Sequence, residues 1–78
     1  MDDNRQKIKK IERSINLIKL MIEKRSDRIK YYEKLIEMGL TFDDQRKLEF
    51  FAAHKRLEIK NLYKKLDELY LEKAFYEA

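Results

Sequence analysis

The 78-residue sequence contains no cysteine, no proline, no tryptophan and a single glycine. The absence of cysteine excludes a small secreted scaffold held together by disulfides, and it removes the thiolates that a cysteine nucleophile or a zinc cluster requires. Because proline is absent and glycine is rare, most of the chain lacks the residues that end helices. The composition therefore favours long helices over sheets and irregular loops.

Long apolar runs are also missing, since no segment approaches the roughly 20 apolar residues that span a bilayer. The chain begins Met1-Asp2-Asp3, which is acidic where a secretory signal peptide is basic. These features predict an intracellular protein without membrane contact, located in the cytoplasm, or in the host cytoplasm if the protein is viral. The net charge of +4 is compatible with a polyanionic partner but does not require one.

Apolar residues recur at intervals of three and four along both halves of the chain. In the first half they are Ile8, Ile11, Ile15, Ile18, Ile22, Ile29, Tyr32 and Ile36, and in the second half they are Leu48, Ala52, Ile59, Leu62, Leu66, Leu69 and Tyr76. This spacing places the residues of each half on one side of an α-helix, as in coiled coils. Each half is therefore predicted to be one long amphipathic helix.

The segment between the halves has the composition of a helix-to-helix turn. Gly39 suits the left-handed conformation that often follows the end of a helix. Thr41 suits the N-cap of a second helix, and Asp43 and Asp44 would place negative charge in its first turn. We expect a single domain over residues 1–78, with a helix over about 3–38, a turn at 39–41 and a helix over about 42–76.

A short turn between two helices makes them antiparallel neighbours. If facing residues have numbers that sum to about 81, Ile22 faces Ile59 and Ile15 faces Leu66. The two apolar series were identified independently, so their agreement under this pairing supports the hairpin. The predicted fold is an all-α antiparallel helical hairpin made of two long coiled-coil helices.

The same pairing places Arg25 and Lys55 opposite each other at positions that otherwise carry apolar residues. Two facing cations repel unless acidic groups neutralise them, and Glu58 and Glu23 are the candidates for that role. In one interpretation, these long side chains reach out of the apolar series into solvent. In the other, the polar layer fixes the register of the helices or receives an acidic group from a partner.

The ends of the helices carry opposite charge. Residues 5–13 contain five basic residues and one acidic residue, whereas residues 67–77 contain four acidic residues and one basic residue. The hairpin would bring these two segments together. We therefore expect them to attract each other within the molecule, in preference to a role of the basic segment as a nucleic-acid arm.

Several large apolar residues lie outside the predicted contact between the two helices. As an oligomer or partner interface we expect Leu17, Leu20, Met21, Tyr31, Leu35, Phe50, Leu57, Tyr63 and Tyr70. A hairpin alone cannot bury all of them, and a helix with apolar residues on most sides usually has more than one neighbour. A homodimer that forms a four-helix bundle would supply those neighbours, and a different protein is the alternative occupant.

Basic residues in the middle of both helices form a candidate surface for a polyanion. They are Arg25, Arg28, Lys30, Lys55, Arg56, Lys60 and Lys64. In a dimeric bundle they would form a stripe able to contact the phosphates of RNA or DNA. Nucleic-acid binding is therefore one alternative function, and a structural or assembly spacer is another.

Catalysis is not expected, because a two-helix rod has few places for a concave pocket with converging polar groups. The single histidine, His54, has Glu58 one helical turn away, which is usually a surface contact. No catalytic residue, metal site, cofactor or small-molecule substrate is predicted. Size and composition suit a small regulator or inhibitor, of the type found in phages and mobile elements, that acts by protein–protein interaction.

Overall fold

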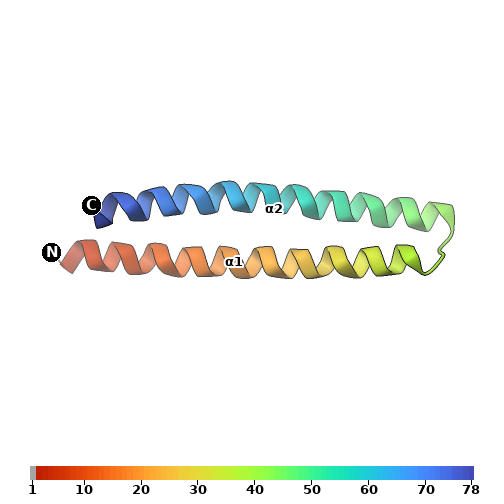
Figure 1. Ribbon diagram of the computed structural model, residues 1–78, viewed down its shortest axis with the longest axis horizontal. Helices are drawn as coiled ribbons and strands as arrows, with labels where there is room; N and C mark the ends of the chain where they lie inside the picture. The colour runs from red at the N-terminus through yellow and green to blue at the C-terminus, as the bar shows by residue number, and fades with distance from the viewer. Residues whose placement is uncertain (1) are drawn as a thin grey trace.

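The computed structural model describes residues 2–78, with side chains from residue 3 onward. Helix α1 (Asp2–Glu37) and helix α2 (Phe42–Glu77) are joined by a turn at residues 38–41. The helices lie side by side and antiparallel, so that α1 begins at the end of the rod where α2 ends (Figure 1). The Cα atoms span 61 × 14 × 12 Å. The predicted all-α antiparallel hairpin is confirmed.

The end of α1 is set by the turn around Gly39. The N–H of Met38 donates to the carbonyl of Leu35 at 3.2 Å, and the N–H of Gly39 donates to the carbonyl of Ile36 at 3.4 Å. These bonds reach back three residues and tighten the last turn of the helix, so α1 ends one residue earlier than expected. Gly39 has φ +80°, as predicted for the residue that follows the helix.

Thr41 is the N-cap of α2, as predicted. Its hydroxyl oxygen accepts a hydrogen bond from the backbone N–H of Asp44 at 3.4 Å and donates to the Asp44 carboxylate at 2.9 Å. The N–H of Gln45 then makes the first helical bond to the carbonyl of Thr41 at 2.9 Å. Asp43 and Asp44 lie in the first turn, where their charge interacts favourably with the helix dipole.

The core is a single layer of side chains between the two helices. Its buried members are Ile11, Ile15, Ile18, Ile22, Ile29, Ala52 and Leu66. Ile59, Leu62, Leu69 and Tyr76 pack against this layer and are partly buried. Ile15 and Leu66 belong to one cluster, in agreement with the predicted pairing. Because the layer is narrow, many large apolar side chains outside it stay exposed in one hairpin.

We expect Ile15→Ala to lower the free energy of unfolding by about 2–4 kcal/mol, because it leaves a cavity in this layer. Leu17→Ala is the matched control, since Leu17 is 59% exposed whereas Ile15 is 4% exposed. Its expected cost is about 0.5 kcal/mol or less. Urea unfolding followed by far-ultraviolet circular dichroism measures both. Equal losses would show that Leu17 is buried in solution and would contradict the prediction.

Candidate binding surfaces

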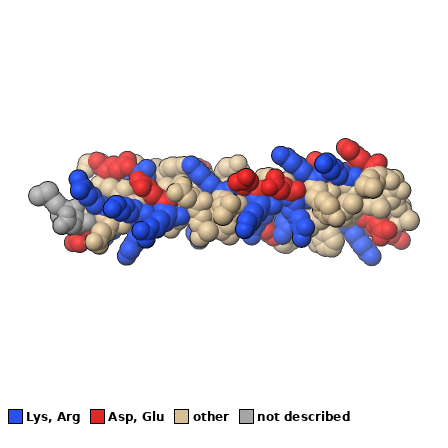
Figure 2. Space-filling view, turned by 90° about the horizontal axis from the view of Figure 1, so that it is seen from below, with Lys and Arg blue, Asp and Glu red and all other residues tan. Residues whose placement is uncertain are grey.

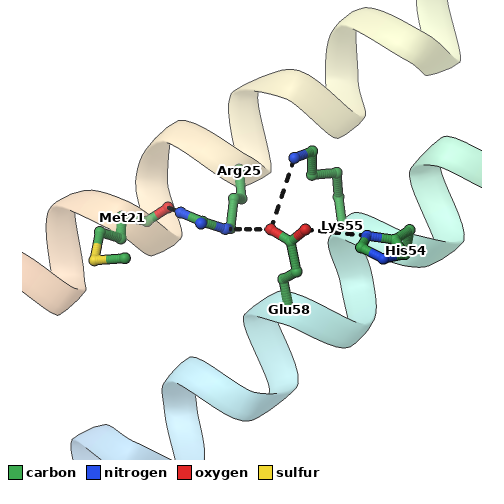
Figure 3. Close-up of polar contacts among 5 residues, drawn as sticks. All are labelled: Met21, Arg25, His54, Lys55 and Glu58. Carbon is green, nitrogen blue, oxygen red and sulfur yellow. Dashed lines mark hydrogen bonds and ion pairs between the residues drawn. The ribbon is translucent and has the colours of Figure 1, made fainter.

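A polar layer interrupts the apolar core near the middle of the rod. Arg25 of α1 extends towards Glu58 of α2, and its Nε donates to Glu58 Oε2 at 2.5 Å (Figure 3). The Nη1 of Arg25 also donates to the carbonyl of Met21 at 3.3 Å. On α2, Lys55 Nζ lies 3.6 Å from Glu58 Oε2, and His54 Nδ1 lies 3.0 Å from Glu58 Oε1. One carboxylate is therefore shared by three nitrogen-bearing side chains.

Glu58 forms ion pairs with both facing cations, as expected, whereas Glu23 does not. Glu23 is exposed, and among residues 3–78 it forms no ion pair within 4.0 Å. The side chains of Arg25 and Lys55 are 28% and 31% exposed. Both cations therefore reach the surface while sharing a single acid, so the layer keeps an excess of positive charge.

The environment of Glu58 favours its ionised form. The hydrogen bond from Arg25 lowers the pKa of the Glu58 carboxyl below its ordinary value, and partial burial opposes this effect. The positive charges of Lys55 and Arg25 lower the same pKa further. The contact of Glu58 with His54 is the surface pair expected for residues four apart on a helix.

A hollow of about 610 Å³ lies beside this polar layer. It is lined by Lys24, Arg25, Asp27, Arg28, Tyr31 and Lys55. On the same side of the hairpin the ring centres of Tyr32 and Phe51 lie 6.1 Å apart. We call this side of the hairpin the Glu58 face.

The opposite side carries different contacts between the helices. Glu33 of α1 forms an ion pair with Arg56 of α2, with 3.1 Å between the oxygen and the nitrogen. Lys19 Nζ lies 5.7 Å from the ring centre of Tyr70, a cation–π contact. We call this side of the hairpin the Tyr70 face.

The predicted interface residues of α1 extend from its outer side onto the Glu58 face. Residues seven apart occupy the same side of a coiled-coil helix. Leu17 therefore lies on the side of Lys24, and both Met21 and Leu35 lie on the side of Arg28. The α1 stripe consists of Leu17, Leu20, Met21, Tyr31, Leu35 and Met38, of which Met21 and Leu35 are partly covered and the others are exposed.

The predicted interface residues of α2 extend from its outer side onto the Tyr70 face. Tyr63 lies seven residues before Tyr70, and it lines one shallow hollow together with Leu57. The α2 stripe consists of Phe50, Leu57, Tyr63, Tyr70 and Leu71, all of them exposed. The hairpin thus places its two apolar stripes on opposite faces. Phe51 of α2, seven residues before Glu58 and 47% exposed, lies on the Glu58 face outside the α2 stripe.

The charges around the two stripes differ. The side of α1 that carries the stripe also carries charged residues. They are the bases Lys7, Lys10, Arg13, Lys24, Arg28 and Lys34 and the acids Asp3 and Asp27. Those around the α2 stripe are the acids Asp43, Glu49, Asp67 and Glu77 and the bases Arg46, Arg56, Lys60 and Lys64. The α1 stripe is therefore bordered by positive charge and the α2 stripe by balanced charge. Figure 2, which views the rod from the α1 side, shows Lys and Arg along its whole length.

The seven candidate polyanion-binding residues are divided between the faces. Arg25, Arg28 and Lys55 line the hollow of the Glu58 face. Arg56 pairs with Glu33 on the Tyr70 face, and Lys30 lies one helical turn before Glu33. The remaining two, Lys60 and Lys64, line the hollow beside Tyr63. One hairpin therefore does not present these bases as a single stripe.

Two residues of the hollow, Lys24 and Asp27, were not among the sequence candidates. Lys24 could have been found from its position, because it lies four residues before Arg28 and seven before Tyr31 on one side of the helix. The hollow itself had no sequence signal, since Lys55 enters it from α2.

The expected attraction between the basic residues 5–13 and the acidic residues 67–77 does not produce close pairs. In the part of the chain that the structure describes, the ion pair between these segments joins Glu12 to Lys73 at 3.5 Å, which reverses the expected signs. The basic segment contacts an aromatic ring instead, with Lys7 Nζ 5.2 Å from the ring centre of Tyr76. Lys10 and Arg13 remain exposed beside the α1 stripe.

Comparison of the chain with protein-family models, curated protein sequences and solved structures finds no match. Across residues 2–78, neither helix contains a stretch long and apolar enough to cross a membrane. The same residues contain no group of three or more His, Asp or Glu side chains placed to hold a metal ion. The two stripes and the hollow are the surface features from which a function can be argued.

We expect hairpin stability to fall as the pH decreases below about 4.5, the ordinary pKa of Glu58. Its pKa is lower in the folded protein, so between the two values the unfolded chain binds a proton that the folded chain does not. The stabilisation is complete above pH 4.5 and is lost as the pH falls through the folded pKa. Glu58→Gln should therefore show a weaker dependence of Tm on pH in this range.

The control is Glu68→Gln, which changes an exposed carboxylate that forms no ion pair among the described residues. Glu58→Gln should also lower Tm at neutral pH, because Arg25 and Lys55 lose their shared acid. Thermal unfolding between pH 3 and pH 7 measures both effects. A Glu58→Gln variant with the full pH dependence of the wild type would refute this account.

Proposed function

We propose that the protein is a non-catalytic binding protein, a small regulator or inhibitor that acts by occupying a surface of another protein. The observation that supports this proposal is the amount of apolar surface left uncovered. Among residues 3–78, thirteen large apolar side chains are exposed, against seven buried apolar residues in the core. Contiguous exposed apolar surface on a folded domain is typical of sites of protein association.

A second copy of the chain is the occupant we propose for the α2 stripe. In a twofold symmetric dimer each surface meets its own copy, so an excess of one charge sign would be repeated on both sides. The α2 stripe has four acids and four bases around it and avoids this cost. The contact joins two hairpins through α2 alone, so this proposal keeps the homodimer expected from the sequence but not a compact four-helix bundle.

Burial of the α2 stripe can drive this association. Its five side chains are between 41% and 73% exposed, and covering each of them gains roughly 1–2 kcal/mol. Ten side chains contribute to a symmetric contact between two copies. The gain is then comparable to or larger than an association cost of about 4–15 kcal/mol.

The same symmetry argues against self-association through the α1 stripe. A twofold contact there would bring the bases around the stripe, among them Lys10, Lys24 and Arg28, close to the same set of bases of the other copy. Repulsion among bases is only partly screened by physiological salt at such short distances. The α1 stripe is therefore left for a different partner in this proposal.

Binding of RNA or DNA is the second candidate function. The excess of bases around the α1 stripe favours it, because phosphate contacts through Lys and Arg supply most non-specific affinity for nucleic acids. Leucine and methionine side chains among those bases favour a protein partner instead, since they gain little from contact with phosphates. We therefore place protein binding first.

Paired substitutions on the two stripes test the proposed dimer. Leu57→Glu with Leu71→Glu places charge in the α2 stripe, and this variant should be a monomer of 9.7 kDa. Leu17→Glu with Leu20→Glu is the matched control on the α1 stripe and should remain a dimer. All four leucines are exposed in the hairpin, so the helical content should not change.

Light scattering coupled to size exclusion measures the mass of each variant, and circular dichroism checks the helices. If Leu17→Glu with Leu20→Glu abolishes the dimer and the α2 substitutions do not, the assignment of the dimer contact to the α2 stripe is contradicted. A wild-type chain that stays monomeric at high concentration would refute the dimer. Growth into ever larger oligomers with concentration would favour an assembly spacer.

A further inference from the structure

We infer that the α1 stripe binds an acidic amphipathic helix of a partner protein, whose carboxylates enter the hollow beside Arg25 and Lys55. This inference rests on the proposed function and specifies the partner. Three observations support it, namely the arrangement of the apolar side chains, the charge around them and the composition of the hollow.

The apolar side chains of the α1 stripe form a line along the helix axis. Leu20 and Met21 lie three and four residues after Leu17, and Leu35 and Met38, three residues apart, continue the line beyond the hollow. A helix laid along such a line meets it with its own side chains at the same intervals. Methionine also adapts to differently shaped partner side chains. The stripe therefore fits a helix better than an extended strand.

The charge around this line selects an acidic partner. Six bases and two acids lie on the same side of α1 as the apolar line. One of the acids, Asp3, lies at the start of the helix. A partner helix with Glu or Asp beside its apolar residues would place them against Lys10, Lys24 and Arg28. Opposite charges across an interface accelerate association and exclude partners of the wrong sign.

The hollow supplies a site for the partner's carboxylates at the centre of the line. It is lined by four bases and a single acid, Asp27. The nearby Glu58 is already shared by Arg25, Lys55 and His54, so four bases face two acids and two positive charges remain. Guanidinium groups bind carboxylates through paired hydrogen bonds, and Arg28 is the exposed guanidinium at this site.

Tyr31 lines the same hollow and is 52% exposed. Its ring is in contact with Tyr32, whose ring centre lies 6.2 Å away, and Tyr32 in turn contacts Phe51 of α2. This row of aromatic rings extends from the contact between the helices to Tyr31, which lies beside the charges. A partner helix would therefore meet an aromatic anchor next to the bases, which is a common composition at the centre of protein interfaces.

The other possible occupants fit this surface less well. The α2 stripe of another copy has balanced charge and would leave the excess of bases without partners. A head-to-tail contact of that kind would also repeat from molecule to molecule into a ring or an open chain. A nucleic acid would match the bases, but it would leave Leu17, Leu20 and Met21 without apolar contacts.

The test uses two synthetic peptides and an oligonucleotide as probes. Both peptides are helical and carry leucine at alternating intervals of three and four residues. The residues that flank the leucines are glutamate in one peptide and lysine in the other. The oligonucleotide is single-stranded thymidine DNA of similar length and charge to the glutamate peptide. Fluorescence anisotropy of labelled probes gives Kd, and methyl NMR signals of Met21 and Met38 locate the site.

We expect the glutamate peptide to bind and to shift the signals of both methionines, and the lysine peptide to bind at least about tenfold more weakly. Lys24→Glu with Arg28→Glu should weaken binding of the glutamate peptide by about tenfold or more. Lys60→Glu with Lys64→Glu, a matched charge reversal beside the α2 stripe, should change Kd by less than about twofold. Leu17→Glu with Leu20→Glu should also abolish binding.

The inference is overturned if the two peptides bind equally, if neither binds, or if reversal at Lys24 and Arg28 has no effect. Binding of the oligonucleotide in place of the glutamate peptide, with the same sensitivity to these variants, would assign the surface to nucleic acid. The measurement is repeated on the Leu57→Glu, Leu71→Glu variant. Failure of the dimer and failure of this docking site are thereby observed separately.

Discussion

The structure depends on the burial of one narrow layer of side chains between two helices. Isoleucine from α1 supplies most of the buried members, and partly buried leucine and isoleucine from α2 close the layer. Each helix gains a neighbour on one side only. The rest of each helix surface is consequently outside the core, and the large apolar residues found there remain exposed. The same narrow contact that forms the hairpin therefore leaves apolar surface for other molecules.

The polar layer interrupts the apolar contact between the helices, and its charged side chains affect both the stability of the hairpin and the charge of its surface. Arg25, Lys55 and Glu58 replace apolar side chains where the helices face each other. Desolvation of charges opposes folding unless each charge has a partner, and here two cations share one carboxylate. Their ends reach the surface, so water removes part of the cost. The layer thus favours one alignment of the helices while it leaves an excess of positive charge beside the hollow.

The opposite placement of the two stripes has consequences for symmetry. A compact four-helix bundle made from two hairpins needs both helices to be apolar on the same face. Here the α1 stripe extends towards the Glu58 face and the α2 stripe towards the Tyr70 face, although Phe51 of α2 also lies on the Glu58 face. A single twofold contact can cover only one of these stripes. The difference in charge around them provides a physical reason for different occupants.

The sequence by itself determined the helices, their turn and their pairing, because these follow from local spacing. Intervals of three and four define the contact side, Gly39 has the expected positive φ, and Thr41 caps α2. Tertiary structure alone decided which side chains of the two helices meet across that contact. The hollow joins Lys55 of α2 to Lys24 and Arg28 of α1, and Glu12 pairs with Lys73 where the opposite signs were expected. Such contacts depend on packing between side chains distant in sequence, so spacing within one helix does not reveal them.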